Sequence, residues 1–251
     1  MKKIISYLIG KLAGAGFSFS IFNLFNMLNG SIFDMYQFSK NVSSPLYWVA
    51  FFGYGLICSI VIDLIVNKVS NKGNSTKVIL YLVAGFSIFF IFGFSIFTII
   101  AGTIGAFAAL LFYFGTMIAN KTPVFKYIFA FAMPILFLTI INVDFTEKQQ
   151  WSEVKNDTSY SASFDLFNGE QKIPINAKEG QTISVAVDIN NENGGGHGQH
   201  VLNEKGKLLP MYESTDDYIR FKAESTGVYN VVITGDNLRG SFFVDWKIED
   251  L

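Results

Sequence analysis

Long apolar runs separated by short polar segments make up the chain as far as about residue 145. A helix needs roughly 20 mostly apolar residues to cross the hydrocarbon core of a bilayer. The run from 78 to 119 has no charged residue and is too long for one crossing, so we place a turn at its small residues Ala101, Gly102 and Thr103. The pattern predicts an α-helical transmembrane bundle over residues 1–145, with five helices at about 4–28, 46–66, 78–98, 103–119 and 127–143.

From Tyr160 onward, apolar and polar residues alternate strictly, a pattern typical of strands with one buried face. In the last such segment the alternation places Phe242, Val244, Trp246 and Ile248 on the inward face. About eight short strands at this spacing predict an all-β sandwich with Greek-key connections over residues 150–251. Five turn signals separate the strands: Asn168-Gly169, Glu179-Gly180, Lys205-Gly206, Thr226-Gly227 and Arg239-Gly240.

The closing strands carry three short patterns: Thr226-Gly227-Val228-Tyr229, then Ile233-Thr234-Gly235, then Gly240-Ser241-Phe242 with Val244 and Trp246. Together they resemble the last strands of bacterial jelly-roll sandwiches of the pre-peptidase C-terminal type. Domains of that type are usually non-catalytic binding or accessory modules. The resemblance therefore implies a binding or accessory role for the C-terminal part of this chain.

The overall composition, 51% hydrophobic and 16% charged, conceals two parts of opposite charge. Residues 1–143 hold nine lysines and two aspartates, a net charge of +7, whereas the rest holds ten basic and eighteen acidic residues, a net of −8. Five crossings put eight of the nine lysines on one side and only Lys40 on the other; a single helix over 78–119 would weaken the split to six against three. Because cytoplasmic flanks are rich in lysine, we expect a multi-pass cell-membrane protein with a cytoplasmic N-terminus and an extracytoplasmic C-terminal domain. Trp48 and Trp151 then fall at the outer interface.

Four polar residues within the apolar runs are candidate functional positions. Lys11 and Asp63 lie at similar depth near the cytoplasmic ends of the first two helices. They can form a structural ion pair, extend separately to water at the membrane interface, or act in a proton or ion relay. Asn23 and Asn26, which continue to Asn29 at three-residue spacing, place amides along one face of the first helix, where they join helices or line a polar path.

Small residues at Ala101, Gly105 and Ala109 recur every four positions. This spacing lets two membrane helices approach closely. We therefore expect the helices at 78–98 and 103–119 to pack against each other.

The two histidines of the chain, His197 and His200, form an H-x-x-H pattern in a glycine-rich segment. Imidazoles at this spacing can bind a transition metal if a third ligand, Glu192 or Glu204, joins them; the alternative is a solvated loop. Acidic residues in turns can also bind a divalent cation or simply form a solvated face. These acidic positions are Glu213, Asp216, Asp217 and Asp236.

The sequence contains no G-x-S-x-G, H-E-x-x-H or phosphate-binding Gly-Lys motif. We therefore expect a protein that is not an enzyme and needs no cofactor. Its only cysteine, Cys58, excludes an intramolecular disulfide, and the acidic C-terminal part disfavours nucleic acid as a partner. The leading hypothesis is a protein of the cell envelope that binds, senses or supports another envelope protein or peptide. A transporter or channel subunit and a membrane enzyme are the alternatives.

Overall fold

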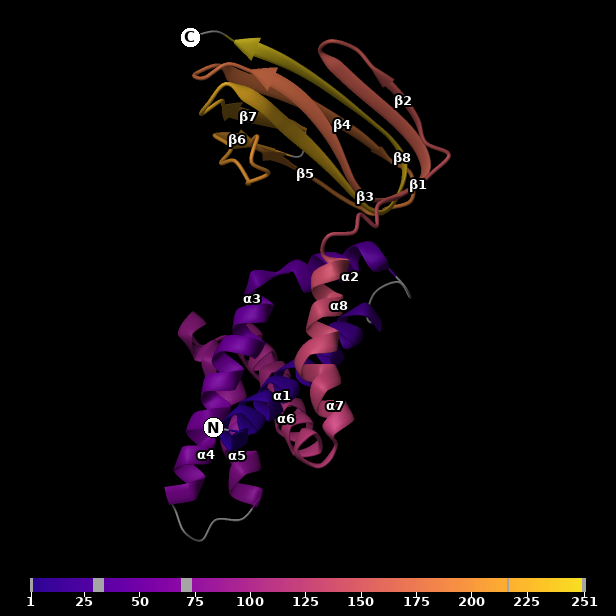
Figure 1. Ribbon diagram of the computed structural model, residues 1–251. Helices are drawn as coiled ribbons and strands as arrows, with labels where there is room; N and C mark the ends of the chain where they lie inside the picture. The colour runs from indigo at the N-terminus through magenta and orange to yellow at the C-terminus, as the bar shows by residue number, and fades with distance from the viewer. Residues whose placement is uncertain (1, 29–33, 69–73, 216, 250–251) are drawn as a thin grey trace. The chain divides into compact units, whose positions relative to one another are not determined.

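The computed structural model describes residues 2–28, 34–68, 74–215 and 217–249 (Figure 1). The chain divides into two compact units, Met1–Asp144 and Phe145–Leu251. The first is helical and the second is built from antiparallel strands. Asn29 and Asp216 lie outside the described residues.

The helical unit consists of long apolar helices, two of which contain a short π-helical segment. Its elements are α1 (Lys2–Leu28), α2 (Met35–Ser43), α3 (Pro45–Trp48), the π-helix η1 (Val49–Gly55), α4 (Leu56–Lys68), α5 (Asn74–Ser87), the 3-10 helix η2 (Ile88–Phe92), α6 (Ile96–Lys121), α7 (Pro123–Tyr127), the π-helix η3 (Ile128–Ala132) and α8 (Met133–Ile140). The segments α3–η1–α4 form one continuous helix, and α7–η3–α8 form another.

Within the described residues of this unit, four helices are long and apolar enough to cross a membrane: Lys2–Met27, Pro45–Lys68, Ile96–Lys121 and Pro123–Ile140. The helix expected at 78–98 is present but shorter, an apolar stretch over Ser75–Ile91. The prediction of a helical N-terminal part is therefore confirmed, with four full-length apolar spans among the described residues where the sequence predicted five.

The turn between α5 and α6 lies earlier than predicted. The chain reverses at Gly93, which has a φ of 86°, and Ser95 caps α6 by accepting a hydrogen bond from the Thr98 amide. A φ in this range favours glycine. Gly102 is instead inside α6, where a Cβ would lie 2.9 Å from the ring of Phe86. Its small size serves helix packing, so the turn predicted at 101–103 was wrong.

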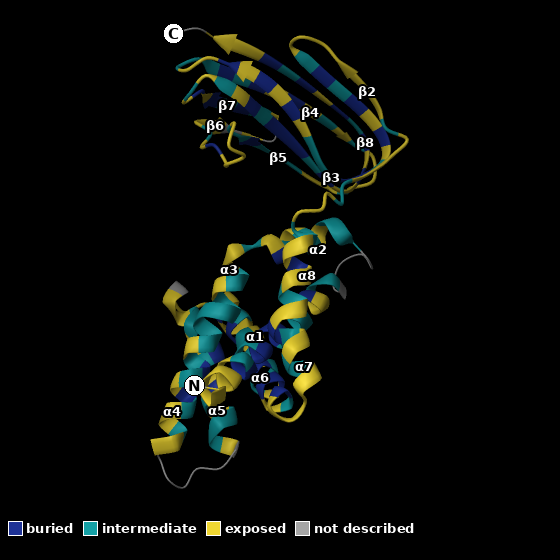
Figure 2. Ribbon diagram, in the orientation of Figure 1, coloured by how far each residue is buried: buried dark blue, intermediate teal, exposed yellow. Residues whose placement is uncertain are grey.

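Glycines let α5 and α6 pack with their backbones close together. A Cβ added at Gly85 would lie 2.3 Å from the carbonyl oxygen of Gly105, and a Cβ at Gly105 would lie 2.3 Å from that of Gly85. Ala109 of α6 packs at the same contact. The packing expected from the four-residue spacing of small residues is therefore present. Helix α1 packs in a similar way against α6, where Gly14 meets Thr116, and Figure 2 shows buried residues along both helices.

The second unit is one eight-stranded antiparallel sheet with the path β1-β3-β8-β4-β7-β6, to which β2 adds beside β3 and β5 beside β8. The prediction that the C-terminal domain is built from β-strands is therefore confirmed. The strands are β1 (Glu147–Gln149), β2 (Ser152–Lys155), β3 (Ser159–Ala177), β4 (Thr182–Asn191), β5 (Gly196–Leu202), β6 (Glu213–Ser214), β7 (Tyr218–Lys222) and β8 (Gly227–Glu249).

Two of the five predicted turns are instead irregularities inside long strands. Gly169 lies within β3 with a φ of 143°, and Gly240 lies within β8 with a φ of 133°. The β3–β8 register shifts between Phe164 and Gly169. Beyond it, the later part of β3 pairs with the beginning of β8, and β5 lies on the other side of that β8 segment. Such irregularities bend a strand without ending it.

Both parts of each long strand contribute to one apolar core. Phe242, Val244 and Trp246 from the end of β8 join Tyr229 and Val231 from its beginning in the same buried cluster. The sheet therefore folds over itself around a shared core. The inward register chosen for the last strand is correct through Trp246, whereas Ile248 is exposed near the end of the strand.

Candidate functional site

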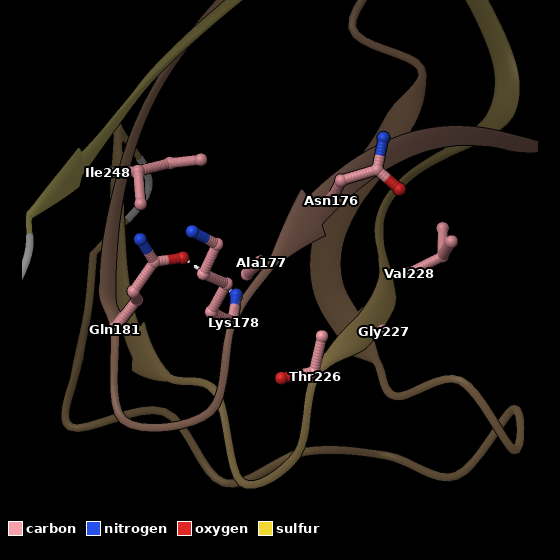
Figure 3. Close-up of a pocket in the computed structure, with 8 residues that line it drawn as sticks. All are labelled: Asn176, Ala177, Lys178, Gln181, Thr226, Gly227, Val228 and Ile248. Carbon is pink, nitrogen blue, oxygen red and sulfur yellow. Dashed lines mark hydrogen bonds between the residues drawn. The ribbon is translucent and has the colours of Figure 1, made fainter.

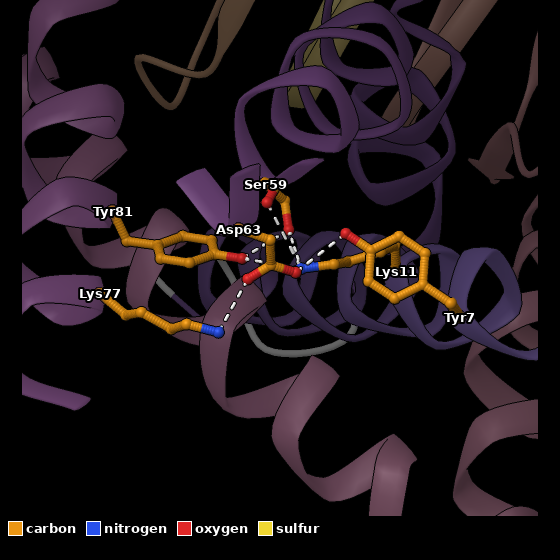
Figure 4. Close-up of polar contacts among 6 residues, drawn as sticks. All are labelled: Tyr7, Lys11, Ser59, Asp63, Lys77 and Tyr81. Carbon is orange, nitrogen blue, oxygen red and sulfur yellow. Dashed lines mark hydrogen bonds and ion pairs between the residues drawn. The ribbon is translucent and has the colours of Figure 1, made fainter. Parts of the chain in front are cut away.

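Six polar side chains from three apolar helices meet inside the helical unit (Figure 4). Each helix supplies two of them, spaced four residues apart and so placed on one face. We call this group the polar cluster: Tyr7 and Lys11 of α1, Ser59 and Asp63 of α4, and Lys77 and Tyr81 of α5.

Asp63 lies at the centre of the polar cluster. Its Oδ2 is 2.6 Å from the Lys11 ammonium and accepts a hydrogen bond of 2.9 Å from the Tyr7 hydroxyl. Its Oδ1 is 2.9 Å from the Lys77 ammonium. Figure 4 shows the two lysines reaching the carboxylate from opposite sides. Both carboxylate oxygens are therefore engaged by cations.

The remaining contacts of the polar cluster surround the Lys11 ammonium. It donates to Ser59 Oγ at 2.7 Å and lies 3.4 Å from the Tyr81 hydroxyl. Ser59 and Tyr81 are also hydrogen-bonded to each other. The Lys11 side chain is only 3% exposed, against 15% for Asp63 and 30% for Lys77. Because an isolated ammonium is costly to bury, these partners explain how Lys11 can lie inside an apolar helix bundle.

The sequence predicted the Lys11–Asp63 pair as one of three alternatives, but it did not single out the other four members of the polar cluster. Lys77 directly precedes the uncharged run that begins at Val78, so the sequence placed it outside the predicted helix. Tyr7, Ser59 and Tyr81 are common residues of membrane helices and stand out only through their four-residue spacing from a charged residue.

The two predicted asparagines lie apart from this group, farther along α1. Asn23 is fully buried and its amide nitrogen donates to the Phe19 carbonyl, while its Oδ1 has no hydrogen-bond partner among the described residues. Asn26 is half-buried. A buried serine on the same helix, Ser18, donates to the Ala108 carbonyl of α6 and so joins two helices.

His197 and His200 both lie in β5, so the glycine-rich segment is a strand from Gly196 onward, whereas Gly194 and Gly195 lie in the loop before it. At a spacing of three residues their side chains leave opposite faces of the strand. Within the described ranges, no group of three His, Cys, Asp or Glu side chains is placed to hold a metal ion. The acidic positions Glu213, Asp217 and Asp236 are exposed.

A cavity of about 370 Å³ opens at one end of the β unit (Figure 3). Its lining comes from the end of β3, the β3–β4 turn and both ends of β8. Val228 and Ile248 contribute apolar surface, and Asn176, Lys178 and Gln181 contribute polar groups. The Gln181 side chain accepts a hydrogen bond of 2.6 Å from the Lys178 amide, which fixes the turn beside the cavity.

Trp151, expected as a membrane-interface side chain, packs on the core of the β unit. Its ring stacks on Phe164 at a centroid distance of 5.3 Å, and its indole nitrogen donates to Glu153. The Tyr160 hydroxyl donates to the same carboxylate oxygen. These two hydrogen bonds lower the pKa of Glu153, whereas burial and the nearby carboxylate raise the pKa of Tyr160. Trp48 lies in the helical unit, where its indole nitrogen donates to the Val42 carbonyl.

No protein-family model matches this chain, and no curated protein matches it. Among solved structures, the chain is similar to PliG of Aeromonas hydrophila, a periplasmic lysozyme inhibitor of g-type lysozyme. The TM-score is 0.26 with 14% sequence identity, and the alignment covers 42% of this chain and 93% of the inhibitor. A likeness of this size carries no argument about function.

Proposed function

We propose that this chain is a multi-pass protein of the cell envelope whose helical unit anchors an extracytoplasmic β unit, and that the β unit binds another envelope protein or peptide. The observation that carries the proposal is that the β unit encloses a large apolar core of its own, from Tyr160 to Trp246. A domain with its own core can be displayed on an anchor and act there as a binding module.

The order of the helices supports the proposed orientation. Because α5 and α6 are antiparallel partners that meet at Gly85 and Gly105, Lys77 and Lys121 lie at the same end of that hairpin. A hairpin returns the chain to the side of the membrane from which it started. The side on which the β unit lies therefore depends on three other helical segments: α1, α3–α4 and α7–α8. An odd number of crossings with lysine-rich cytoplasmic ends supports an extracytoplasmic β unit.

The polar cluster supports an anchoring role for the helical unit. Asp63 is bonded through both oxygens, and Lys11 has four oxygen partners on Asp63, Ser59 and Tyr81. Polar side chains that bond across helices hold membrane bundles together. We therefore assign the polar cluster the role of holding α1, α4 and α5 together.

Reporter fusions test the topology directly. Alkaline phosphatase joined after residue 251 should be active in a bacterial host, because that enzyme works only outside the cytoplasm, and a fluorescent reporter that matures only in the cytoplasm should stay dark at the same position. The opposite pair of results would reject the proposed orientation.

Site-specific photo-crosslinking in intact cells tests binding by the β unit. Val228 at the cavity and Phe243, which lies three residues past the Gly240 irregularity of β8 and outside the cavity lining, are similarly exposed, at 41% and 46%, so they form a matched pair of crosslinker positions. A defined protein adduct from Val228 that Phe243 does not give supports partner binding at the cavity end. If neither position gives an adduct, the result counts against a binding role. It does not bear on the topology, which the reporter fusions test.

A further inference from the structure

The turn between α5 and α6 carries the most exposed large apolar side chains in the described part of the chain. Ile91 and Phe94 are each 80% exposed and Phe97 is 79% exposed. Phe90 and Ile96 are exposed beside them. We call residues 90–97 the hairpin tip. A turn that protrudes into water normally carries several polar residues, and the hairpin tip carries only one, Ser95.

The one polar side chain of the hairpin tip is used within the turn. Ser95 accepts a hydrogen bond of 3.2 Å from the Thr98 amide and lies 2.9 Å from the Thr98 hydroxyl. The Gly93 amide donates to the Phe90 carbonyl at 3.1 Å. Because polar groups in a bilayer must find partners within the protein, these internal bonds suit an apolar environment.

The length of α5 also places the hairpin tip at the edge of the hydrocarbon core. From Val78, the first residue after Lys77, ten α-helical and five 3-10 residues lead to Phe92. At about 1.5 Å and about 2.0 Å per residue they span about 25 Å. The hydrocarbon core is about 30 Å thick, so with Lys77 at its edge α5 is too short to lift the turn clear of it; α6 is longer because it continues past the level of Lys77 to Lys121. Irregular backbone is not tolerated deeper among lipids, which puts the turn at the boundary.

We propose that the apolar side chains of the hairpin tip are inserted among the acyl chains of the leaflet opposite the lysine-rich helix ends, while its backbone turn lies at the boundary of the hydrocarbon core. Lipid acyl chains fit the surface because it is apolar, exposed and without charge: no Asp, Glu, Lys or Arg occurs from Val78 to Ala119. This contact goes beyond the proposed function and holds whichever side of the membrane the β unit occupies.

Spin labels in the full-length protein test this contact. In a Cys58→Ser background, Phe94→Cys would be labelled and the protein placed in phosphatidylcholine–phosphatidylglycerol nanodiscs, where both membrane faces are accessible. Collisions with oxygen report lipid, and collisions with a water-soluble nickel chelate report water. Phe107→Cys, exposed in the middle of α6, is the lipid control, and Lys155→Cys, exposed on β2, is the water control.

We expect the Phe94 label to show high oxygen access, as at Phe107, and to lose most of the nickel access seen at Lys155. Nickel access equal to that at Lys155 would overturn the proposal in favour of an aqueous loop. Low access to both reagents would overturn it in favour of a protein contact, and dipolar broadening would then identify a second copy of the chain. Ile91→Cys, equally exposed, repeats the measurement at a second position.

Discussion

Lys11 and Asp63 form an ion pair of 2.6 Å between α1 and α4. These are the charged residues that interrupt two otherwise apolar helices, and the structure joins them in one contact. Lys77 pairs with the other carboxylate oxygen, so one aspartate links three helices. Removal of that single carboxylate would leave two ammonium groups facing each other without a counter-ion.

We therefore expect Asp63→Ala to destabilise the helical unit by about 3–5 kcal/mol, the range measured when one partner of a buried pair is lost. Thermal unfolding of the full-length protein in mild detergent would show the loss. The double variant Lys11→Met with Asp63→Leu should recover most of it, because apolar replacement of both partners removes the buried charge. Lys77→Met, at a more exposed position, should cost much less. A double variant no more stable than Asp63→Ala would show that the pair is not the reason for the loss.

Gly105→Ala should weaken the α5–α6 hairpin, because the new methyl group would overlap the backbone carbonyl of Gly85, which has no rotamer to change. We expect a cost of about 1–3 kcal/mol, as for other overpacked contacts, measured by the same thermal unfolding. Gly53→Ala is the matched control, since its Cβ would meet only Val49 at 3.7 Å. Equal stability of the two variants would contradict the close approach of α5 and α6.

The sequence predicted the helical segments well but placed one turn wrongly, for a physical reason. Gly93 and Gly102 both lie within the uncharged run, and glycine permits a reversal of the chain as readily as a close helix contact. Only the position of Phe86 over Gly102 decides between them, and a contact between helices is not visible in local sequence. Lys11 and Asp63 were identified because charge is rare in such runs. Tyr7, Ser59 and Tyr81 were missed because their role depends on the neighbouring helix.

In the β unit, too, the sequence predicted some features correctly and did not reveal others. Alternation correctly predicted which side of the last strand is buried, since Val244 and Trp246 face inward and Phe243 is exposed. It did not reveal that Gly169 and Gly240 bend strands and do not end them. Glycine with a positive φ occurs in turns and in bulges alike, so the residue alone does not distinguish a turn from a bulge.

The β unit should fold without the helical unit, because its core cluster is drawn from residues after Phe145. Residues 145–251, expressed alone, should give a cooperative thermal transition and a β-type circular dichroism spectrum. A fragment starting at 157 is the informative comparison: it lacks Trp151, which packs on Phe164 and Phe167, and should melt at a lower temperature. A disordered 145–251 fragment would show that the β unit depends on the membrane part.

The pH dependence of the β unit should follow the Glu153–Tyr160 hydrogen bond. The pKa of Glu153 is lowered by folding, so its contribution to stability is present above the ordinary glutamate pKa of about 4.3 and lost as the pH falls through the folded value. The pKa of Tyr160 is raised, so its contribution is present below about 10 and lost as the pH rises further. Glu153→Gln should flatten the acid side of the melting-temperature profile, and Tyr160→Phe the alkaline side. Unchanged profiles in both variants would exclude this bond as a source of pH dependence.

Trp246 and Asp245 are neighbours on β8 with opposite surroundings, which makes them a direct test of the strand's facing. Trp246 is 6% exposed and belongs to the core, whereas Asp245 is only partly buried. Trp246→Ala removes a large aromatic and leaves a cavity, so it should lower the free energy of unfolding of the isolated β unit by about 3–5 kcal/mol. Asp245→Ala should stay within about 0.5 kcal/mol, as substitutions away from the core usually do. Denaturant unfolding at constant pH measures both values. A larger loss for Asp245→Ala than for Trp246→Ala would mean that the last strand faces the other way, because a one-residue shift in register exchanges the two faces of a strand.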